Sequence, residues 1–205
     1  MPRKDDYINA FNLAAAELRE KDPAEVSRFS AVTYDSDKQA FLLDFIGRAH
    51  IVRFPGCEVQ IPGSNQEVPI QEQGLILHYL NNADGTPPAE EHITYREIPS
   101  GEFYYPAFVK RAEAPLVSVF GRDVQKLIVA AEELDGQVVP GMGDAAVSVK
   151  GFPRVTLTLV LWEGDDEFEP AGKILFDRNI NHYLSVEDVA VLSGMVVYRL
   201  MRLAS

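Results

Sequence analysis

Segments typical of β-strands follow one another directly in two parts of this 205-residue chain, which limits the folds open to it. In the first half, Ala40–Ile46 and His50–Phe54 are separated by only a few residues. In the second half, the strand-like segments are Ala145–Lys150, Val155–Trp162 and Lys173–Phe176. Parallel neighbours need a crossover of about a dozen residues or more, and these connections are mostly shorter. The order predicts an α+β fold with an antiparallel or mixed sheet packed with several helices.

Apolar residues spaced three and four apart predict the helices. Four of them are expected over Tyr7–Glu20, Gln71–Asn81, Glu102–Arg111 and Arg122–Leu134. The strongest pattern predicts a long C-terminal helix over Val186–Leu203, beginning after Ser185, whose side chain is a good N-cap with Asp188 three residues on. Two further strands are expected over Arg28–Tyr34 and His92–Ile98.

The length and a hydrophobic content of 46% favour one folded domain. A possible subdomain joint lies at residues 82–88, where Asn, Gly and Pro gather. No apolar run approaches the roughly 18 residues that a membrane helix needs, and no apolar stretch follows the basic residues of the N-terminus. We therefore expect a cytoplasmic protein. The single cysteine, Cys57, excludes an internal disulfide and a self-contained Fe-S cluster.

The charge of the chain argues against several classes of partner. Asp and Glu number 31 against 19 Lys and Arg, which gives a net charge of −12, and the excess lies within residues 55–172. A negative field repels phosphate backbones and anionic membranes, so we expect neither nucleic acid nor a membrane as partner. A cation or a protein with a basic patch suits this charge better, and plain solubility also explains it.

An acidic turn is the first candidate site. Five of the seven residues of Glu163–Glu169 are carboxylates. Adjacent carboxylates repel one another, and a bound hard cation relieves that repulsion. The turn predicts a divalent metal site with Asp165, Asp166 and Glu167 as ligands, although the spacing does not fit the EF-hand loop. The alternative is a solvated hairpin tip that charge keeps soluble.

A second candidate site precedes the last helix. Asp177, Asn181 and His182 could bind a small anion or polar cofactor, together with the first amides of that helix. If the strands on either side of the acidic turn form a hairpin, Asp177 lies about five residues, or about 17 Å, from its tip. The two clusters are then separate sites. The alternative is that Asp177 caps a turn and His182 packs at a helix end.

The remaining polar residues give no catalytic pattern. His78 lies in an apolar segment and is best interpreted as a semi-buried structural histidine. Ser193 lies within a helical pattern and does not form a nucleophile elbow. The aromatic group Phe103–Tyr105 beside Phe108 could line a pocket for a flat ligand, and core packing explains it equally well.

Several short segments in a fixed order resemble one known family. They include Leu75–Leu80, Tyr95–Gly101, Ala114–Leu116, Ile174–Asp177 and Glu187–Asp188. From about residue 25 to its C-terminus, the chain resembles the domain-of-unknown-function family numbered 3786, found mostly in anaerobic bacteria and archaea. The resemblance implies a soluble α+β domain, in some relatives joined to a cysteine-rich iron–sulfur segment that this chain lacks. It also implies a setting in corrinoid or one-carbon metabolism, with Asp166, Glu167 and Asp177 at recurring acidic positions.

Three functions are compatible with the sequence. The first is a non-enzymatic accessory protein of anaerobic metabolism that binds a protein partner or a small ligand between sheet and helices. The second is a structural or assembly subunit that forms a homodimer through its last helix. The third is a divalent-metal-dependent enzyme that uses Asp165, Asp166 and Glu167. The cofactor, if any, is otherwise unknown.

Overall fold

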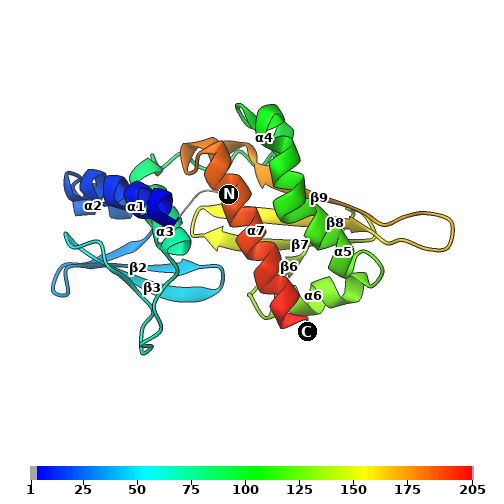
Figure 1. Cartoon of the computed structure of the whole chain (residues 1–205), viewed down its shortest axis with the longest axis horizontal. Helices are drawn as coiled ribbons and strands as arrows, with labels where there is room; N and C mark the ends of the chain where they lie inside the picture. Colours follow the sequence, from blue (N-terminus) through cyan, green and yellow to red (C-terminus); the bar gives the residue numbers. More distant parts are fainter. Residues whose placement is uncertain (1–3, 205) are drawn as a thin grey trace.

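The computed structural model describes residues 4–204 and contains two antiparallel sheets side by side (Figure 1). The first sheet has the order β1-β2-β3-β4, with strands Thr33–Asp35 (β1), Ala40–Phe45 (β2), Arg48–Arg53 (β3) and Val59–Gln60 (β4). The second has the order β5-β9-β8-β7-β6, with strands His92–Thr94 (β5), Gln137–Val138 (β6), Ala145–Phe152 (β7), Val155–Trp162 (β8) and Ala171–Asp177 (β9). The predicted α+β class is confirmed, with two sheets where one was expected.

Helices cover both sheets. Those of the first half are Lys4–Arg19 (α1), Pro23–Ser30 (α2) and Ile70–Asn82 (α3). Those of the second half are Gly101–Phe108 (α4), Ala114–Phe120 (α5), Val124–Glu132 (α6) and Val186–Leu203 (α7), with the short helical segments Tyr95–Glu97 (η1), Val109–Glu113 (η2, a π-helix) and Arg178–His182 (η3). Helix α7 crosses one face of the second sheet (Figure 1). No helix within residues 4–204 is long and apolar enough to cross a membrane.

The last helix has the predicted bounds because its signals are local. The Ser185 side chain accepts a hydrogen bond from the Asp188 backbone N–H at 3.1 Å, as its sequence position predicted. The predicted apolar stripe of this helix is buried at Val189, Leu192, Val196 and Leu200, and its last member, Leu203, is 37% exposed. Most of that stripe therefore packs within the chain and is not available as a surface for a second copy.

Two predicted strands are wrong over most of their length. The strand expected over Arg28–Tyr34 is largely replaced by α2, which Asp22 caps and which has a proline at its first position. The strand expected over His92–Ile98 ends at Thr94. There the Thr94 and Glu97 side chains form a capping box that turns the chain into η1.

The helix expected over Glu102–Arg111 does not end at Arg111. Helix α4 continues without a break through the π-helical turn η2 into α5, so the helical run extends to Phe120. In the π-helical turn η2 the backbone hydrogen bonds span five residues, one more than in an α-helix. Single turns of this kind within α-helices are frequent at functional sites.

The two sheets share one core. The Ile46 backbone N–H donates to the Gly151 carbonyl at 3.1 Å, which joins the β2–β3 turn to β7. The rings of Phe45 and Phe152 lie 4.8 Å apart. Buried side chains from both halves form one continuous hydrophobic cluster.

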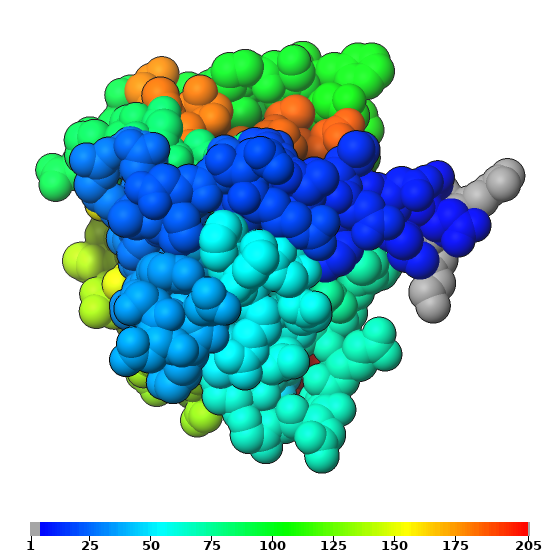
Figure 2. Space-filling model, turned by 90° about the vertical axis from the view of Figure 1, so that its left-hand side faces the viewer, coloured from blue at the N-terminus to red at the C-terminus, as the bar shows by residue number. Residues whose placement is uncertain are grey.

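The chain passes from the first sheet to the second where the subdomain joint was predicted. Helix α3 ends at Asn82, and the chain reaches β5 at His92. The connection between them, residues 83–91, has no regular structure. In Figure 2, α1 and α2 (blue) lie between the first sheet (light blue to cyan) and the orange segment that leads into α7.

Candidate functional site

The acidic turn extends away from the rest of the molecule between β8 and β9 (Figure 1). The Asp165 Oδ1 atom accepts hydrogen bonds from the backbone N–H groups of Glu167 at 2.8 Å and Phe168 at 2.7 Å. These bonds, led by that from Phe168, lower the pKa of the exposed Asp165 carboxyl. Within residues 4–204, no group of three or more His, Cys, Asp or Glu residues is placed to hold a metal ion. A metal bound by Asp165, Asp166 and Glu167 stays a prediction.

The second predicted cluster holds the connection between the sheets. The Asp177 carboxylate accepts hydrogen bonds from the backbone N–H groups of Ala89 at 2.9 Å, Glu90 at 2.8 Å and Asn179 at 2.9 Å. The carboxylate therefore ties residues 83–91 to the start of η3. This geometry supports the turn-capping interpretation of Asp177.

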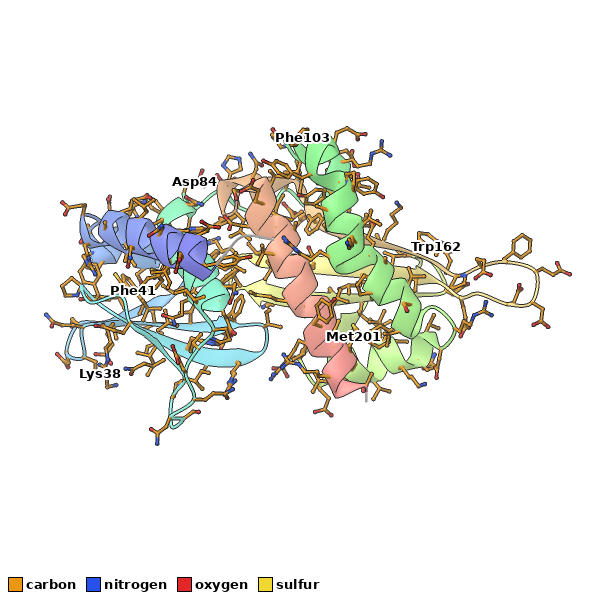
Figure 3. All side chains as sticks on the ribbon, viewed as in Figure 1. Lys38, Phe41, Asp84, Phe103, Trp162 and Met201 are labelled. Carbon is orange, nitrogen blue, oxygen red and sulfur yellow. The ribbon has the colours of Figure 1, made fainter. Side chains whose placement is uncertain are left out.

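His182 is engaged with the same connection. Its Nδ1 atom lies 2.7 Å from Oδ2 of Asp84, which Figure 3 labels near the start of α7. Hydrogen bonds from Thr86 and His182 lower the pKa of Asp84 to about 2. Asn181 is exposed and makes no side-chain hydrogen bond within the described chain. A ligand site at Asp177, Asn181 and His182 stays a prediction.

The strand register confirms that the two clusters are separate. Trp162 pairs with Ala171, and Leu157 pairs with Phe176. Asp177 therefore follows Ala171 by six residues, at the opposite end of β9, which corresponds to roughly 20 Å. It lies near the start of β8 and not beside its middle, so the separation is larger than predicted.

A pocket lined by four arginines lies between α7 and the first half of the chain. We call it the arginine pocket; it has a volume of about 580 Å³, and its arginines are Arg48, Arg111, Arg199 and Arg202. Arg48 begins β3 directly after the tight turn at Ile46 and Gly47, where both residues have positive φ. Arg111 lies on the π-helix η2. Three separate chain segments, β3, η2 and α7, thus bring positive charge to one cavity of an acidic protein.

The two α7 arginines lie beside the buried stripe. Arg199 and Arg202 are three residues apart and so occupy neighbouring turns of one helix face. The same face brings Val191, Met195 and Tyr198 to the pocket. Helix α7 therefore uses one face for the core and another for the cavity.

The four guanidinium groups have no anionic partner within residues 4–204. The arginines that form ion pairs there are Arg28, Arg96, Arg122 and Arg178, and none of them lines this pocket. Two carboxylates also line the pocket, Glu67 and Glu72, and neither forms an ion pair with these arginines within the described residues. The Oε1 atom of Glu72 lies 3.3 Å from Nε2 of His50. The Nε atom of Arg199 is buried and makes no hydrogen bond. A buried donor of this kind is costly unless a ligand or water accepts from it.

A second pocket adjoins the first. We call it the histidine pocket; it has a volume of about 390 Å³ and lies among α1, α3, α4 and α7. The two pockets share four lining residues: Tyr7, Gln71, Arg111 and Val191. The two cavities therefore adjoin each other, and we call them together the groove.

His78 and Asp188 form a pair in the histidine pocket. The Nδ1 atom of His78 lies 2.9 Å from Oδ1 of Asp188, and Oδ2 of Asp188 accepts a hydrogen bond from the Ser185 hydroxyl at 2.7 Å. The hydrogen bond that the His78 ring donates to Asp188 raises the pKa of His78, against the opposing effect of burial. The Nε2 atom of His78 makes no hydrogen bond within the described chain. Asp188 thus fixes the ring and leaves Nε2 facing the groove.

A larger cavity lies elsewhere. It has a volume of about 1280 Å³ and is lined by residues of both sheets. Its charged lining residues are Asp44, Asp135 and Lys150, which are of mixed sign. Because this cavity gathers no set of like charges or paired titratable groups, the groove is the better candidate for a specific site.

Sequence reasoning missed the groove. His78 was expected to be a structural histidine, and it is indeed half-buried and hydrogen-bonded, but its partner is 110 residues away in the chain. The one local signal was the pair Arg199 and Arg202, which share a second face of an otherwise apolar helix. Tyr104, from the aromatic group considered for a flat-ligand pocket, lines the histidine pocket.

Comparison with known proteins identifies one family. A family model described as a domain of unknown function, DUF3786, matches residues 22–199. The match covers most of the chain and confirms the resemblance seen in the sequence. No curated protein and no solved structure matches the chain.

Proposed function

Because the chain belongs to the DUF3786 family, whose description names no reaction, we propose a function from its own residues: it is a non-enzymatic protein that binds a small anionic ligand in the arginine pocket. The observation that carries this proposal is the convergence of Arg48, Arg111, Arg199 and Arg202 on one cavity without a carboxylate partner. Guanidinium groups bind carboxylate and phosphate through charge-assisted, often bidentate hydrogen bonds.

The charge of the whole chain explains why the ligand is small. A net charge of −12 repels large polyanions such as nucleic acid, whose backbones would extend over the acidic surface. A compact anion within the pocket meets four positive groups at short range. Cavity walls of low dielectric strengthen that attraction.

The family resemblance supports a wider setting for this binding role. On that basis, we assign the protein to the cytoplasm as an accessory component of anaerobic, corrinoid or one-carbon metabolism. We also propose a protein partner, because a protein that binds a ligand without converting it acts by passing the ligand, or the signal of its binding, to another protein. A homodimer would need a surface other than the apolar stripe of α7, because most of that stripe is buried.

Calorimetric titration with inorganic pyrophosphate and with citrate tests the proposal. We expect binding to one site, with an affinity that falls as salt rises. The Arg199→Gln/Arg202→Gln double variant is expected to bind at least tenfold more weakly, because each lost charge-assisted hydrogen bond contributes about 1.5–3 kcal/mol. The matched control is the Arg96→Gln/Arg178→Gln double variant, which removes the same two charges from surface pairs with Glu102 and Glu91.

The proposal fails if neither anion binds the wild-type protein at millimolar concentration in low salt. It also fails if Arg96→Gln/Arg178→Gln weakens binding as much as the pocket variant does, since that result would reflect overall charge and not the pocket. Thermal unfolding of each variant without ligand separates lost binding from lost folding.

A further inference from the structure

The groove is long enough for more than a simple anion. The arginine pocket of about 580 Å³ adjoins the histidine pocket of about 390 Å³, and both are lined by Tyr7, Gln71, Arg111 and Val191. Small-molecule sites range from about 300 to 1,000 Å³. A single ligand can therefore place different groups in the two parts of the groove.

The two parts differ in charge. The arginine pocket has four arginines against two carboxylates, Glu67 and Glu72. The histidine pocket has three carboxylates, Asp6, Glu187 and Asp188, and only Arg111 as a permanent cation. A second anionic group is thus unfavourable at the histidine end, and a neutral group that donates hydrogen bonds is favourable there.

The histidine pocket also suits a flat ring. Tyr7 from α1 and Tyr104 from α4 bring aromatic rings to it, and Leu75 and Ala107 supply apolar walls. The ring of Tyr104 makes an edge contact with Phe103 at 5.1 Å, and a hydrogen bond with Glu187 accompanies it. Aromatic side chains bind heterocycles by stacking, which tolerates different bases because every base has a π-face.

His78 provides a specific contact for such a ring. Its Nδ1 is held by Asp188 at 2.9 Å, and its Nε2 has no partner within residues 4–204. Neutral His78 accepts a hydrogen bond through Nε2, and protonated His78 donates one. The edge of a nitrogen heterocycle offers both donors and acceptors, so either state of His78 finds a partner.

We infer that the groove binds a phosphorylated nitrogen heterocycle, with its phosphates among the arginines and its ring beside Tyr104, hydrogen-bonded to Nε2 of His78. This inference rests on the proposed function, since it extends an anion site into the adjoining pocket. Nucleoside diphosphates are the simplest soluble members of this class. Their two phosphates also make inorganic pyrophosphate a matched fragment.

The experiment compares ADP, GDP and UDP with inorganic pyrophosphate on the full chain. We expect at least one nucleoside diphosphate to bind at least tenfold more tightly than pyrophosphate. His78→Asn keeps an amide near the Nδ1 position for Asp188 but lacks Nε2. This variant is expected to bind the nucleotide about tenfold more weakly and to bind pyrophosphate as the wild-type protein does. His92→Asn, on β5 outside the groove, is the matched control.

The possible outcomes separate the two proposals. If pyrophosphate binds and no nucleoside diphosphate binds more tightly, the inference is overturned and the anion site stands. If nothing binds, the proposed function itself is overturned.

Tyr104→Ala is a second test that does not depend on His78, and it is expected to reduce the affinity for nucleotide and to leave the affinity for pyrophosphate unchanged. In NMR spectra, the His78 ring signals are expected to shift with nucleotide and not with pyrophosphate; the reverse result contradicts the inference.

Discussion

Tyr79 of α3 and Phe152 of β7 stack face to face, with ring centroids 4.2 Å apart and ring planes 6° from parallel. Both side chains are almost completely buried. The Tyr79 hydroxyl donates to the Ser30 carbonyl and accepts from the Arg154 backbone N–H at 3.2 Å. This pair joins the helical layer of the first half to the end of the second sheet, so it holds together the two walls between which the groove lies.

Removing the Phe152 ring is therefore expected to destabilise the whole chain. Phe152→Ala deletes a large buried side chain and leaves a cavity, which costs about 3–5 kcal/mol of unfolding free energy. Urea denaturation followed by circular dichroism measures the loss. The control is Phe103→Ala, because Phe103 is 81% exposed and its removal is expected to change stability by less than about 0.5 kcal/mol. Equal effects at the two positions would contradict a shared core.

Stability is expected to depend on pH through His78. Its folded-state pKa is raised above the ordinary 6.5, so the folded protein holds the proton more tightly than the unfolded chain does. The stabilisation is fully present below about pH 6.5 and is lost as the pH rises through the raised folded pKa. Wild-type protein and His78→Gln are compared by urea denaturation at pH 6 and pH 9. The difference in unfolding free energy should be larger at pH 6, and an equal difference at both values contradicts the prediction.

Asp177 is expected to hold the connection between the sheets. Asp177→Ala leaves three backbone N–H groups without their acceptor and should loosen residues 84–90. Since these groups are partly exposed, we expect a loss of about 1–2 kcal/mol. Hydrogen exchange of this segment should rise, while pyrophosphate binding stays unchanged. A loss of binding with no change in exchange would instead favour the predicted ligand site at Asp177, Asn181 and His182.

The metal hypothesis for the acidic turn makes its own prediction. If Asp165, Asp166 and Glu167 bind a divalent cation, Ca²⁺ or Mg²⁺ at about 100 times its Kd should stabilise the fold by about 2.7 kcal/mol. The Asp166→Asn/Glu167→Gln variant should abolish that gain and keep the Asp165 hydrogen bonds that shape the turn. An unchanged melting temperature of the wild-type protein argues against the metal.

Local signals in the sequence were sufficient for several elements. The bounds of α7 and β8 are as predicted, because an apolar pattern with a clear cap or turn at its ends defines each one. Helix α2 was missed because Asp22 and Pro23 were interpreted only as the end of the preceding helix, whereas they also begin the next one. Tertiary packing decides whether such residues end one helix or also begin the next, and a single sequence does not show that packing.

The groove could not be predicted from the sequence, because its residues meet only in the tertiary structure. Its arginines come from β3, η2 and α7, and no spacing rule connects them. The His78–Asp188 pair joins two helices from different halves of the chain. By contrast, the acidic turn and the Asp177 cluster were visible because their members are adjacent in the chain, and that adjacency reflects turn formation at Asp165 and Asp177.

The position of the single tryptophan has an optical consequence. Trp162 lies at the base of the acidic turn, is 44% exposed, and is not part of the groove (Figure 3). Its fluorescence is therefore an intrinsic reporter of the hairpin between β8 and β9 and is expected to stay constant when a ligand enters among the arginines. A change in emission on ligand addition would show that occupancy of the groove is transmitted along the second sheet to its far end.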